Sequence, residues 1–383
     1  MKVLFVINNY YAKGNGLSAS ARRTVEKLKE YGIDVKVLSG FNTESEVQPD
    51  FVLKHFNIPV FNGLVKKQGY QFAKSDKEII KQAVLWADVV HLEEPFILQI
   101  ETAVIAKKYN TPCTGTYHLH PENLFASVGL GDSHIFNDTL MTIWRNELFN
   151  KCKIIQCPTE NVKERLEKWK FKSELRMISN GLNMEDLIQR TENNPLHISD
   201  AKYHIITIGR YSVEKDIITL LKAMNYTKYN KDIQLIIAGR GPQEKSLKKY
   251  ADKLYKKGII KYYPDFGFHS LEELQRLSIG SDLYIHCAYI EVEGLSCMEA
   301  IQTGLVPIIA EGNLTATSKF ALSDRSKFKA RDPEDLAYKI DYWLDNDDLR
   351  KEEAKKYIGI GKKYVIDHSI VQLIKMFNDA LIK

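Results

Sequence analysis

Two glutamates at a fixed spacing are the strongest candidates for binding chemistry. Glu291 and Glu299 lie eight positions apart, with Gly294 between them and an apolar run on each side. The pattern predicts a strand, a loop that carries Glu291, a helix that begins near Gly294 and a second strand after Gly304. Glu299 should then lie about one turn inside the helix, and Glu291 should face the start of that helix.

The start of this helix is a candidate anion site. In the first turn, the backbone N–H groups of Gly294, Leu295 and Ser296 have no acceptor within the helix. The helix dipole adds partial positive charge there, which favours phosphate or carboxylate ligands. Carboxylates on both sides suit hydroxyl groups, because they accept hydrogen bonds from them. Hydroxyl groups beside phosphate describe a nucleotide sugar. The alternative is a solvated helix residue at Glu299 and a loop charge at Glu291.

A second set of charged residues follows a predicted strand at residues 203–208. Gly209 and Arg210 come directly after this strand, and Lys215 follows before the next predicted helix. A guanidinium can hold two phosphate oxygens at once, and an ammonium adds a compact positive charge. We therefore expect a diphosphate to bind at this strand-to-helix turn. A pair of surface cations is the alternative.

Glycines and aromatic residues mark the ends of the next predicted elements. Gly239 and Gly241 form a turn at the end of a buried strand. The sequence then predicts a strand over residues 259–263, followed by a turn that contains Phe266 and Phe268. Small residues at a strand end allow a ligand to approach the backbone closely.

In the first half of the chain, polar side chains follow two predicted strands, at residues 88–91 and 112–117. They are His91, Glu93, Glu94, His118, His120, Glu122 and Asn123. Open α/β sheets bind ligands beyond the carboxyl ends of their strands, so both groups should lie on one rim. Imidazole and carboxylate are ordinary zinc ligands, and the three histidines with Glu93 could form a metal site. A histidine that merely caps its strand is the simpler alternative for His118.

Strands and helices alternate along both halves of the chain, which predicts an α/β fold with parallel sheets covered on both faces. A length of 383 residues suits two domains rather than one. The polar, aperiodic stretch 185–200 is typical of a linker. We therefore expect domains at residues 1–184 and 201–365, and a terminal helix over 366–383.

Composition narrows the classes of function. The formal charge of +5 permits acidic partners, but no nucleic-acid-binding module appears, and we expect no nucleic acid partner. Five scattered cysteines without metal spacing indicate a reducing compartment, hence the cytoplasm. No segment reaches the apolar length of a membrane span. Lysine clusters and the stretch Lys66 to Lys81 could rest on anionic lipid, although solvated helix faces explain them equally well.

The motif Glu-x-x-Gly-x-x-x-x-Glu at residues 291–299, followed by Gly-x-x-Pro-x-Ile, resembles the paired glutamates of the retaining glycosyltransferases of family 4. This resemblance implies the GT-B fold, in which two Rossmann-like domains face each other across a cleft and a terminal helix crosses back to the first domain. It implies that Glu291 contacts hydroxyls of the donor sugar and Glu299 the ribose. Glu293 departs from the family, which usually has an aromatic residue there.

Other family positions follow in the same order along the chain. The resemblance implies that His118 contacts the donor sugar near the reacting carbon, and that Arg210 and Lys215 bind the pyrophosphate. It places a further donor contact at the loop of Gly16. It also places Gly209, Gly239 and Gly241 near the nucleotide, and the backbone of Phe266 to Phe268 near the base. Glu94, Glu122 and Asn123 are candidates on the acceptor side only.

The resemblance implies transfer of a hexose from a nucleoside-diphosphate sugar, most often a UDP-sugar, to a glycolipid or saccharide acceptor. The product would be an α-glycoside, and neither a metal nor another cofactor would be needed. Attachment at the inner face of a membrane would suit a lipid acceptor. Two alternatives stay open: a sugar-nucleotide epimerase of the same architecture and a non-catalytic carbohydrate-binding or scaffold protein. A phosphorylase lacks support, because no lysine suited to a covalent cofactor is evident.

Overall fold

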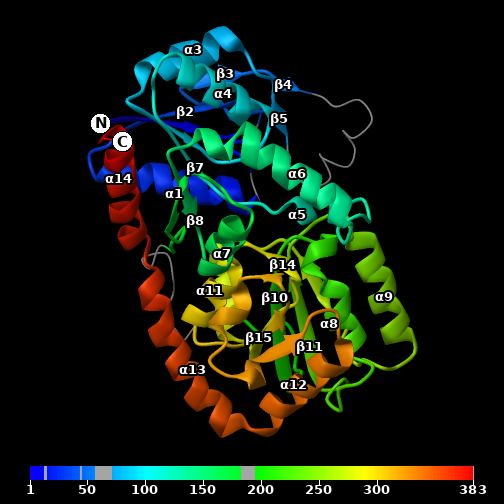
Figure 1. Ribbon diagram of the computed structural model, residues 1–383. Coiled ribbons are helices and arrows are strands. Elements are labelled where there is room, and N and C mark those ends of the chain that lie inside the picture. Colours follow the sequence, from blue (N-terminus) through cyan, green and yellow to red (C-terminus); the bar gives the residue numbers. More distant parts are fainter. Residues whose placement is uncertain (13–14, 44, 57–70, 183–194, 383) are drawn as a thin grey trace. The chain divides into compact units, whose positions relative to one another are not determined.

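The computed structural model describes residues 1–12, 15–43, 45–56, 71–182 and 195–382 (Figure 1). The chain divides into two compact units, Met1–Gly181 with Ile366–Lys383, and Leu182–Val365. The boundary therefore falls at residues 181/182, slightly before the sequence-based boundary at 184. Most of the linker predicted at 185–200 lies outside the described residues.

The first unit contains a seven-stranded parallel sheet with the order β3-β2-β1-β6-β7-β8-β9. Its strands are β1 (Lys2–Val6), β2 (Asp34–Gly40), β3 (Phe51–Leu53), β6 (Val89–Leu92), β7 (Cys113–Thr116), β8 (Ile154–Cys157) and β9 (Glu174–Met177). A separate antiparallel pair joins β4 (His55–Phe56) to β5 (Phe72–Ala73). The central strands β6, β7 and β8 are short and fully buried, as expected for parallel strands covered on both faces, whereas the edge strands β3 and β9 are partly exposed.

Helices connect these strands (Figure 1). They are α1 (Gly16–Glu30), α3 (Lys77–Trp86), α4 (Ile97–Lys108), α5 (Pro121–Ala126), α6 (His134–Glu147), η1 (Phe149–Lys151), α7 (Glu160–Lys168) and the terminal α14 (Ile366–Ile382). The terminal helix belongs to the first unit, where its apolar face shares a buried cluster with β1 and α1. Leu28 of α1 and Phe377 of α14 are both fully buried in that cluster.

The second unit contains a six-stranded parallel sheet with the order β12-β11-β10-β13-β15-β17. Its strands are β10 (Tyr203–Ile208), β11 (Ile233–Ala238), β12 (Asp265–Gly267), β13 (Leu283–His286), β15 (Val306–Glu311) and β17 (Lys327–Lys329). A short parallel pair, β14 (Ile290–Glu291) with β16 (Leu314–Thr315), lies outside this sheet. The connecting helices are η2 (Val213–Lys215), α8 (Ile217–Ala223), α9 (Glu244–Lys256), α10 (Leu271–Ile279), α11 (Leu295–Gln302), η3 (Thr317–Phe320), η4 (Asp324–Ser326), α12 (Pro333–Asp345), α13 (Asp347–Gly361) and η5 (Lys362–Tyr364).

The predicted strand at residues 259–263 is wrong. The amide of Ile259 donates to the carbonyl of Leu254 at 3.0 Å and so completes the end of α9, after Gly258 turns the chain with φ +64°. An amide used to cap a helix is not available to a sheet. The strand comes later, as β12, where Phe266 pairs with Ile237 of β11.

In both sheets the strand order reverses direction once, next to the first strand of the unit. In the first unit β1 lies between β2 and β6, and in the second β10 lies between β11 and β13. Connections leave such a reversal toward opposite faces, so a crevice forms beyond the carboxyl ends of the two strands. The residues that follow β1 and β6, and those that follow β10 and β13, are therefore the expected ligand-binding positions of each unit.

Two glycine turns allow the ends of β10 and β11 to approach each other in the second unit. Gly239 has φ +151°, and a Cβ atom there would lie 1.9 Å from the carbonyl oxygen of Gly209. A Cβ atom at Gly241 would lie 2.6 Å from the carbonyl oxygen of Tyr211. The amide of Tyr211 donates to the carbonyl of Arg240 at 3.0 Å, which joins the two turns directly. The backbone after β10 can therefore adopt this conformation only because positions 239 and 241 are glycines.

We expect the substitution Gly239→Ala to destabilise the protein by about 3 kcal/mol or more, because strained φ and a backbone clash act together. The matched control is Gly359→Ala in α13, where a Cβ atom meets nothing within 4 Å. Alanine there should stabilise by at most about 1 kcal/mol. Urea unfolding of both variants measures the difference. Equal stabilities would contradict the close approach of the two turns.

Candidate functional site

The crevice between β10 and β13 brings together Lys215 and Glu291, which are far apart in sequence. Lys215 ends the short helix η2 after β10, and Glu291 ends β14 after β13. The ammonium of Lys215 forms an ion pair and hydrogen bond with Oε2 of Glu291. Both side chains are mostly buried, with exposed fractions of 22% and 14%. The predicted phosphate-binding cation and the predicted sugar-binding carboxylate therefore neutralise each other in this structure.

His286, the last residue of β13, also faces this carboxylate. Its Nε2 lies 3.4 Å from Oε2 of Glu291, close enough for attraction but without hydrogen-bond geometry. Burial alone would raise the pKa of Glu291, but the Lys215 charge and the imidazole of His286 outweigh it and hold that pKa well below its usual range. Burial lowers the pKa of His286, although the carboxylate opposes this. The lowered pKa of Glu291 makes this carboxylate a charged hydrogen-bond acceptor at neutral pH.

The beginning of α11 lies directly beside Glu291. Gly294 precedes the helix with φ +79°, and a Cβ atom there would lie 2.1 Å from Cγ2 of Thr317 and 3.3 Å from Cγ of Glu291. Only glycine fits this position. The amides of Leu295 and Ser296 come first in the helix and have no intrahelical acceptor. The hydroxyl of Tyr284 lies 3.2 Å from Oγ of Ser296 and 3.2 Å from Nδ1 of His286, which links the start of the helix to the partner of Glu291.

Arg210 is exposed on the turn that follows β10. The neighbouring Tyr211 is buried, and its hydroxyl donates to the carbonyl of Ile237. Phe266 of β12 packs against Tyr211 with ring centroids 6.2 Å apart. Phe268 is 61% exposed, and the guanidinium of Arg240 lies 4.8 Å from its ring centroid. Aromatic and guanidinium surfaces therefore extend past the ends of three adjacent strands.

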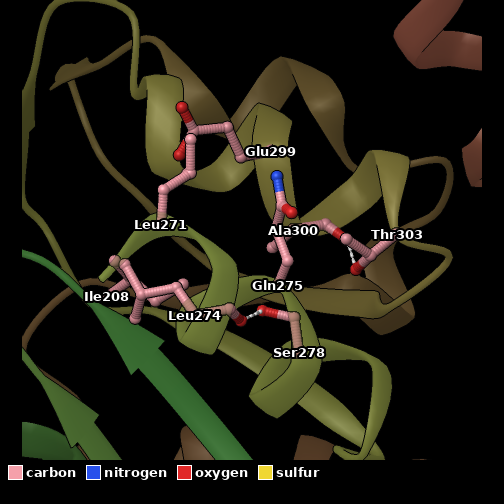
Figure 2. A pocket seen from close by; sticks show the side chains of 8 residues that line it. All are labelled: Ile208, Leu271, Leu274, Gln275, Ser278, Glu299, Ala300 and Thr303. Atoms are coloured by element: carbon pink, nitrogen blue, oxygen red, sulfur yellow. Dashed lines mark hydrogen bonds between the residues drawn. The ribbon is translucent and has the colours of Figure 1, made fainter. Parts of the chain in front are cut away.

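Glu299 lies inside α11 and lines a small pocket between α10 and α11 (Figure 2). The other residues around this pocket are Ile208, Leu271, Leu274, Gln275, Ser278, Ala300 and Thr303. Ile208 is the last residue of β10, directly before Gly209. The second carboxylate of the motif therefore borders the strand end that carries the glycine turn. Ser278 and Thr303 direct their hydroxyls to the carbonyls of their own helices, at 2.7 Å each.

In the first unit, the crevice between β1 and β6 holds a carboxylate between two imidazoles. Oε2 of Glu93 accepts a hydrogen bond from Nε2 of His118 at 2.7 Å, and its Oε1 lies 3.1 Å from Nε2 of His91. Burial would raise the pKa of Glu93, but the two imidazoles outweigh this and lower it to about 2. His118 is nearly buried, with 10% of its side chain exposed.

Two family models match the chain in succession. The model described as Glycosyltransferase Family 4 matches residues 14–186, and the model described as Glycosyl transferases group 1 matches residues 189–363. Together they span both units almost completely. The chain belongs to this glycosyltransferase family.

Relatives and solved structures agree with this assignment. The alpha-monoglucosyldiacylglycerol synthase of Streptococcus pneumoniae is 24% identical over 323 residues, which cover 82% of this chain and 71% of that protein. Sucrose-phosphate synthase of Thermosynechococcus elongatus has a TM-score of 0.77 at 14% identity, covering 99% of this chain and 98% of the other. Anabaena HepE in complex with UDP and glucose has a TM-score of 0.74 at 13% identity, covering 99% and 100%. These likenesses show the GT-B fold expected from the sequence.

The acceptor-side candidates of the glycosyltransferase all make contacts within the first unit. Glu94 is buried and accepts hydrogen bonds from the amide and side chain of Asn8, at 2.7 and 2.8 Å. Glu122 is buried and pairs with Arg165 at 2.7 Å. Asn123 accepts from the amide of His120 at 2.9 Å. These contacts organise loops and helix ends, and an acceptor role for the three residues stays a prediction.

Gly16 is the first residue of α1, and a Cβ atom there would meet nothing within 4 Å. The side chain of Asn15 caps this helix by accepting from the amide of Leu17 at 3.0 Å. Space is therefore available at Gly16, and its predicted contact with the donor stays a prediction.

The described residues were also searched for a metal site and for a membrane-spanning helix. Among the described residues, no group of three or more His, Cys, Asp or Glu side chains is arranged to hold a metal ion. Glu93 instead contacts His118 and His91, two of the residues predicted to bind the same metal ion. Within the same part of the chain, no helix combines the length and apolarity that crossing a membrane requires.

Sequence reasoning about the glycosyltransferase did not identify His286 and Tyr284 as supports of the site, and it considered Glu93 only as a possible metal ligand together with the three histidines. The feature that marks His286 and Glu93 is their position at strand ends. His286 ends β13 and Glu93 directly follows β6, and these two strands flank the reversals of strand order in the two sheets. That signal becomes usable only when the strand order is known.

Asp216 gives the second unit a testable dependence on pH. It begins α8 in a left-handed conformation, with φ +47°, and accepts a hydrogen bond from Oγ1 of Thr219 at 2.6 Å. Burial raises the pKa of Asp216 to about 6, against the smaller opposing effects of Thr219 and Arg331. A carboxyl that binds protons more tightly when folded lowers stability as pH rises from about 4 to about 6, and the loss persists above that range.

We expect Asp216→Asn to stabilise the glycosyltransferase at pH 7 by up to about 3 kcal/mol and to flatten the stability profile between pH 4 and 6. Asparagine tolerates the left-handed conformation, and its amide oxygen can still accept from Thr219. Urea unfolding at each pH measures this, with the exposed Asp200→Asn as the control. An unchanged profile in Asp216→Asn would show that this carboxyl does not titrate as proposed.

Proposed function

We propose that the protein is a retaining glycosyltransferase that moves a hexose from a UDP-sugar to a lipid or glycolipid acceptor and forms an α-glycosidic bond. The observation that carries the proposal is the pairing of Lys215 with Glu291 beside the first amides of α11. The name of the pneumococcal relative supports a glucosyl group and a diacylglycerol-based acceptor. The HepE complex, which contains UDP and glucose, supports the donor class.

Donor binding would separate the paired charges. A pyrophosphate can take the ammonium of Lys215 and the guanidinium of Arg210, while sugar hydroxyls donate to Glu291 in place of the ammonium. Each charged group exchanges one partner for another, so neither is left buried and unpaired. Glu299, which lies inside α11, would bind the ribose. The proposed site needs no metal, because cations of the chain and helix amides meet the phosphate charge.

These groups act most strongly in the transition state. As the bond from the sugar C1 to the phosphate oxygen breaks, negative charge grows on that oxygen, and Lys215, Arg210 and the amides of Leu295 and Ser296 stabilise it. The acceptor hydroxyl attacks C1 from the side of the leaving group, and its proton passes to the departing phosphate oxygen. The new C1–O bond then keeps the α configuration. The resemblance to family 4 assigns a contact with the donor sugar to His118 as well.

A lipid acceptor would require action at a membrane surface, and we propose peripheral binding to an anionic inner leaflet. Part of the basic stretch Lys66 to Lys81 lies outside the described residues. Within α3, Lys77 is exposed and Lys81 partly exposed. Each basic residue near an anionic surface contributes about 1 kcal/mol of attraction.

A panel of donors and acceptors tests the proposal. The protein is incubated with UDP-glucose, UDP-galactose or GDP-mannose, with and without vesicles containing diacylglycerol or monoglucosyldiacylglycerol, in the presence of EDTA. We expect one UDP-sugar to give an α-linked lipid, identified by NMR, and slow hydrolysis of that donor without acceptor. Interconversion of the donor without acceptor would indicate an epimerase instead. No turnover of any donor would overturn the proposed reaction.

We expect Lys215→Met to lower turnover by about 10²- to 10³-fold, because one stabilising charge on the leaving group is lost. The variant also leaves Glu291 without its cation, so some stability should be lost. The double variant Lys215→Met/Glu291→Gln should recover stability but not turnover. Lys222→Met, at an exposed position of α8, is the control. Parental turnover in Lys215→Met would remove the phosphate role.

A further inference from the structure

The hydrogen bonds around Glu93 assign a hydrogen to one particular nitrogen of His118. Gln156 donates through Nε2 to the carbonyl of Ile178 at 3.0 Å, so its Oε1 accepts the hydrogen of Thr116 at 2.8 Å. Oγ1 of Thr116 lies 2.9 Å from Nε2 of His91 and must accept there, since its only hydrogen is already used. Nε2 of His91 therefore carries a hydrogen.

The other contacts complete this assignment. Nδ1 of His91 lies 2.9 Å from Oγ1 of Thr114, and the same hydroxyl lies 3.4 Å from the carbonyl oxygen of Val90. Nε2 of His91 also lies 3.1 Å from Oε1 of Glu93. An ionised carboxylate only accepts, so Oε2 of Glu93 receives the Nε2 hydrogen of His118 at 2.7 Å. In the form of the His118 imidazole that carries one hydrogen, that hydrogen is therefore on Nε2 and Nδ1 is the acceptor.

We propose that Glu93 is a positioning residue of the transfer reaction, which fixes the orientation and tautomer of His118 so that Nδ1 accepts a hydrogen bond from a donor-sugar hydroxyl. The inference rests on the proposed function, because it assumes that His118 contacts the sugar. What it adds to that function is that Glu93 controls His118 and that Nδ1 is the nitrogen that faces the substrate.

The strand register holds this arrangement in place. His91 pairs with Thr114 across β6 and β7, and Thr116 pairs with Gln156 across β7 and β8, so the hydrogen-bonded side chains come from matched positions. His91 is further fixed by rings from two other elements, Phe5 of β1 and Phe377 of α14, at 4.8 and 5.3 Å between centroids. A carboxylate held this firmly can orient the imidazole beside it.

Two titratable groups face Glu93 in the described part of the chain, His118 and His91. The rings from β1 and α14 carry no charge. The pKa of Glu93, lowered to about 2 by these imidazoles against the effect of burial, keeps the carboxylate ionised throughout the working range of an enzyme. Its neighbour Glu94 accepts hydrogen bonds from the side chains of Asn8 and Gln99 instead.

A double-mutant cycle on the full chain tests the proposal with the donor and acceptor found active in the panel. We expect Glu93→Gln to lower kcat by about 10- to 100-fold, because the glutamine amide can donate to Nε2 and favour the wrong tautomer. The KM for donor and the affinity for UDP should change by less than about threefold. In a His118→Gln background, Glu93→Gln should lower kcat by no more than about twofold further.

The matched control is Glu353→Gln, which alters a buried glutamate paired with Lys356 rather than with an imidazole. It should leave kcat unchanged. Multiplicative losses of kcat in the cycle, or an unchanged kcat in Glu93→Gln, would overturn the positioning role. An inactive wild-type protein would instead count against the proposed function itself, so the two failures are distinguishable.

A measurement on the unaltered protein decides the tautomer even if Glu93→Gln does not fold. Ring ¹⁵N chemical shifts identify the protonated nitrogen of each histidine, and the His118 signals are those missing from His118→Gln. We expect the hydrogen on Nε2 of His118 between pH 7 and 8. A hydrogen on Nδ1 would overturn the proposal.

Discussion

The ion pair between Lys215 and Glu291 is the interaction on which the second unit's site depends. It joins two loops that leave adjacent parallel strands, β10 and β13, at the point where the strand order reverses. Opposite charges that are mostly buried stabilise each other only while they stay together, and a ligand that offers both an anion and hydroxyls can replace each partner at once. The pair therefore preserves the arrangement of a charged site in the absence of ligand, with both groups already positioned and largely desolvated.

The backbone around this pair is possible only because of glycine. Gly294 lets Glu291 lie against the first turn of α11, and Gly239 lets the turn after β10 approach the end of β11. In each case a Cβ atom would collide with a neighbouring group at about 2 Å, so these positions are determined by contact and not by flexibility. Of the two, Gly294 also brings the first amides of α11 beside Glu291.

The sequence predicted the α/β class, the alternation of elements and the family, because short apolar strands, helix caps and the spaced glutamates are local patterns. It failed at residues 259–263, where an apolar run completes a helix end and the strand begins only after Pro264. It also missed the supporting role of His286, and it considered Glu93 only as a possible metal ligand. Their importance comes from strand order, which decides which strand ends are neighbours, and strand order is a property of long-range pairing that no local pattern contains.

The two units use the same means to keep a carboxylate charged in a nearly dry place. Glu291 lies between Lys215 and His286, and Glu93 lies between His118 and His91. In each unit, one of the two partners is a histidine on a strand next to the reversal of strand order, His286 on β13 or His91 on β6. The Nδ1 atom of each of these histidines contacts a hydroxyl group, that of Tyr284 or of Thr114. Burial alone would favour the protonated acid, which can donate as well as accept and so leaves the direction of a hydrogen bond open. Two nitrogen partners remove that freedom. A carboxylate that can only accept requires the imidazole bonded to it to donate, and this constraint places a hydrogen on Nε2 of His118.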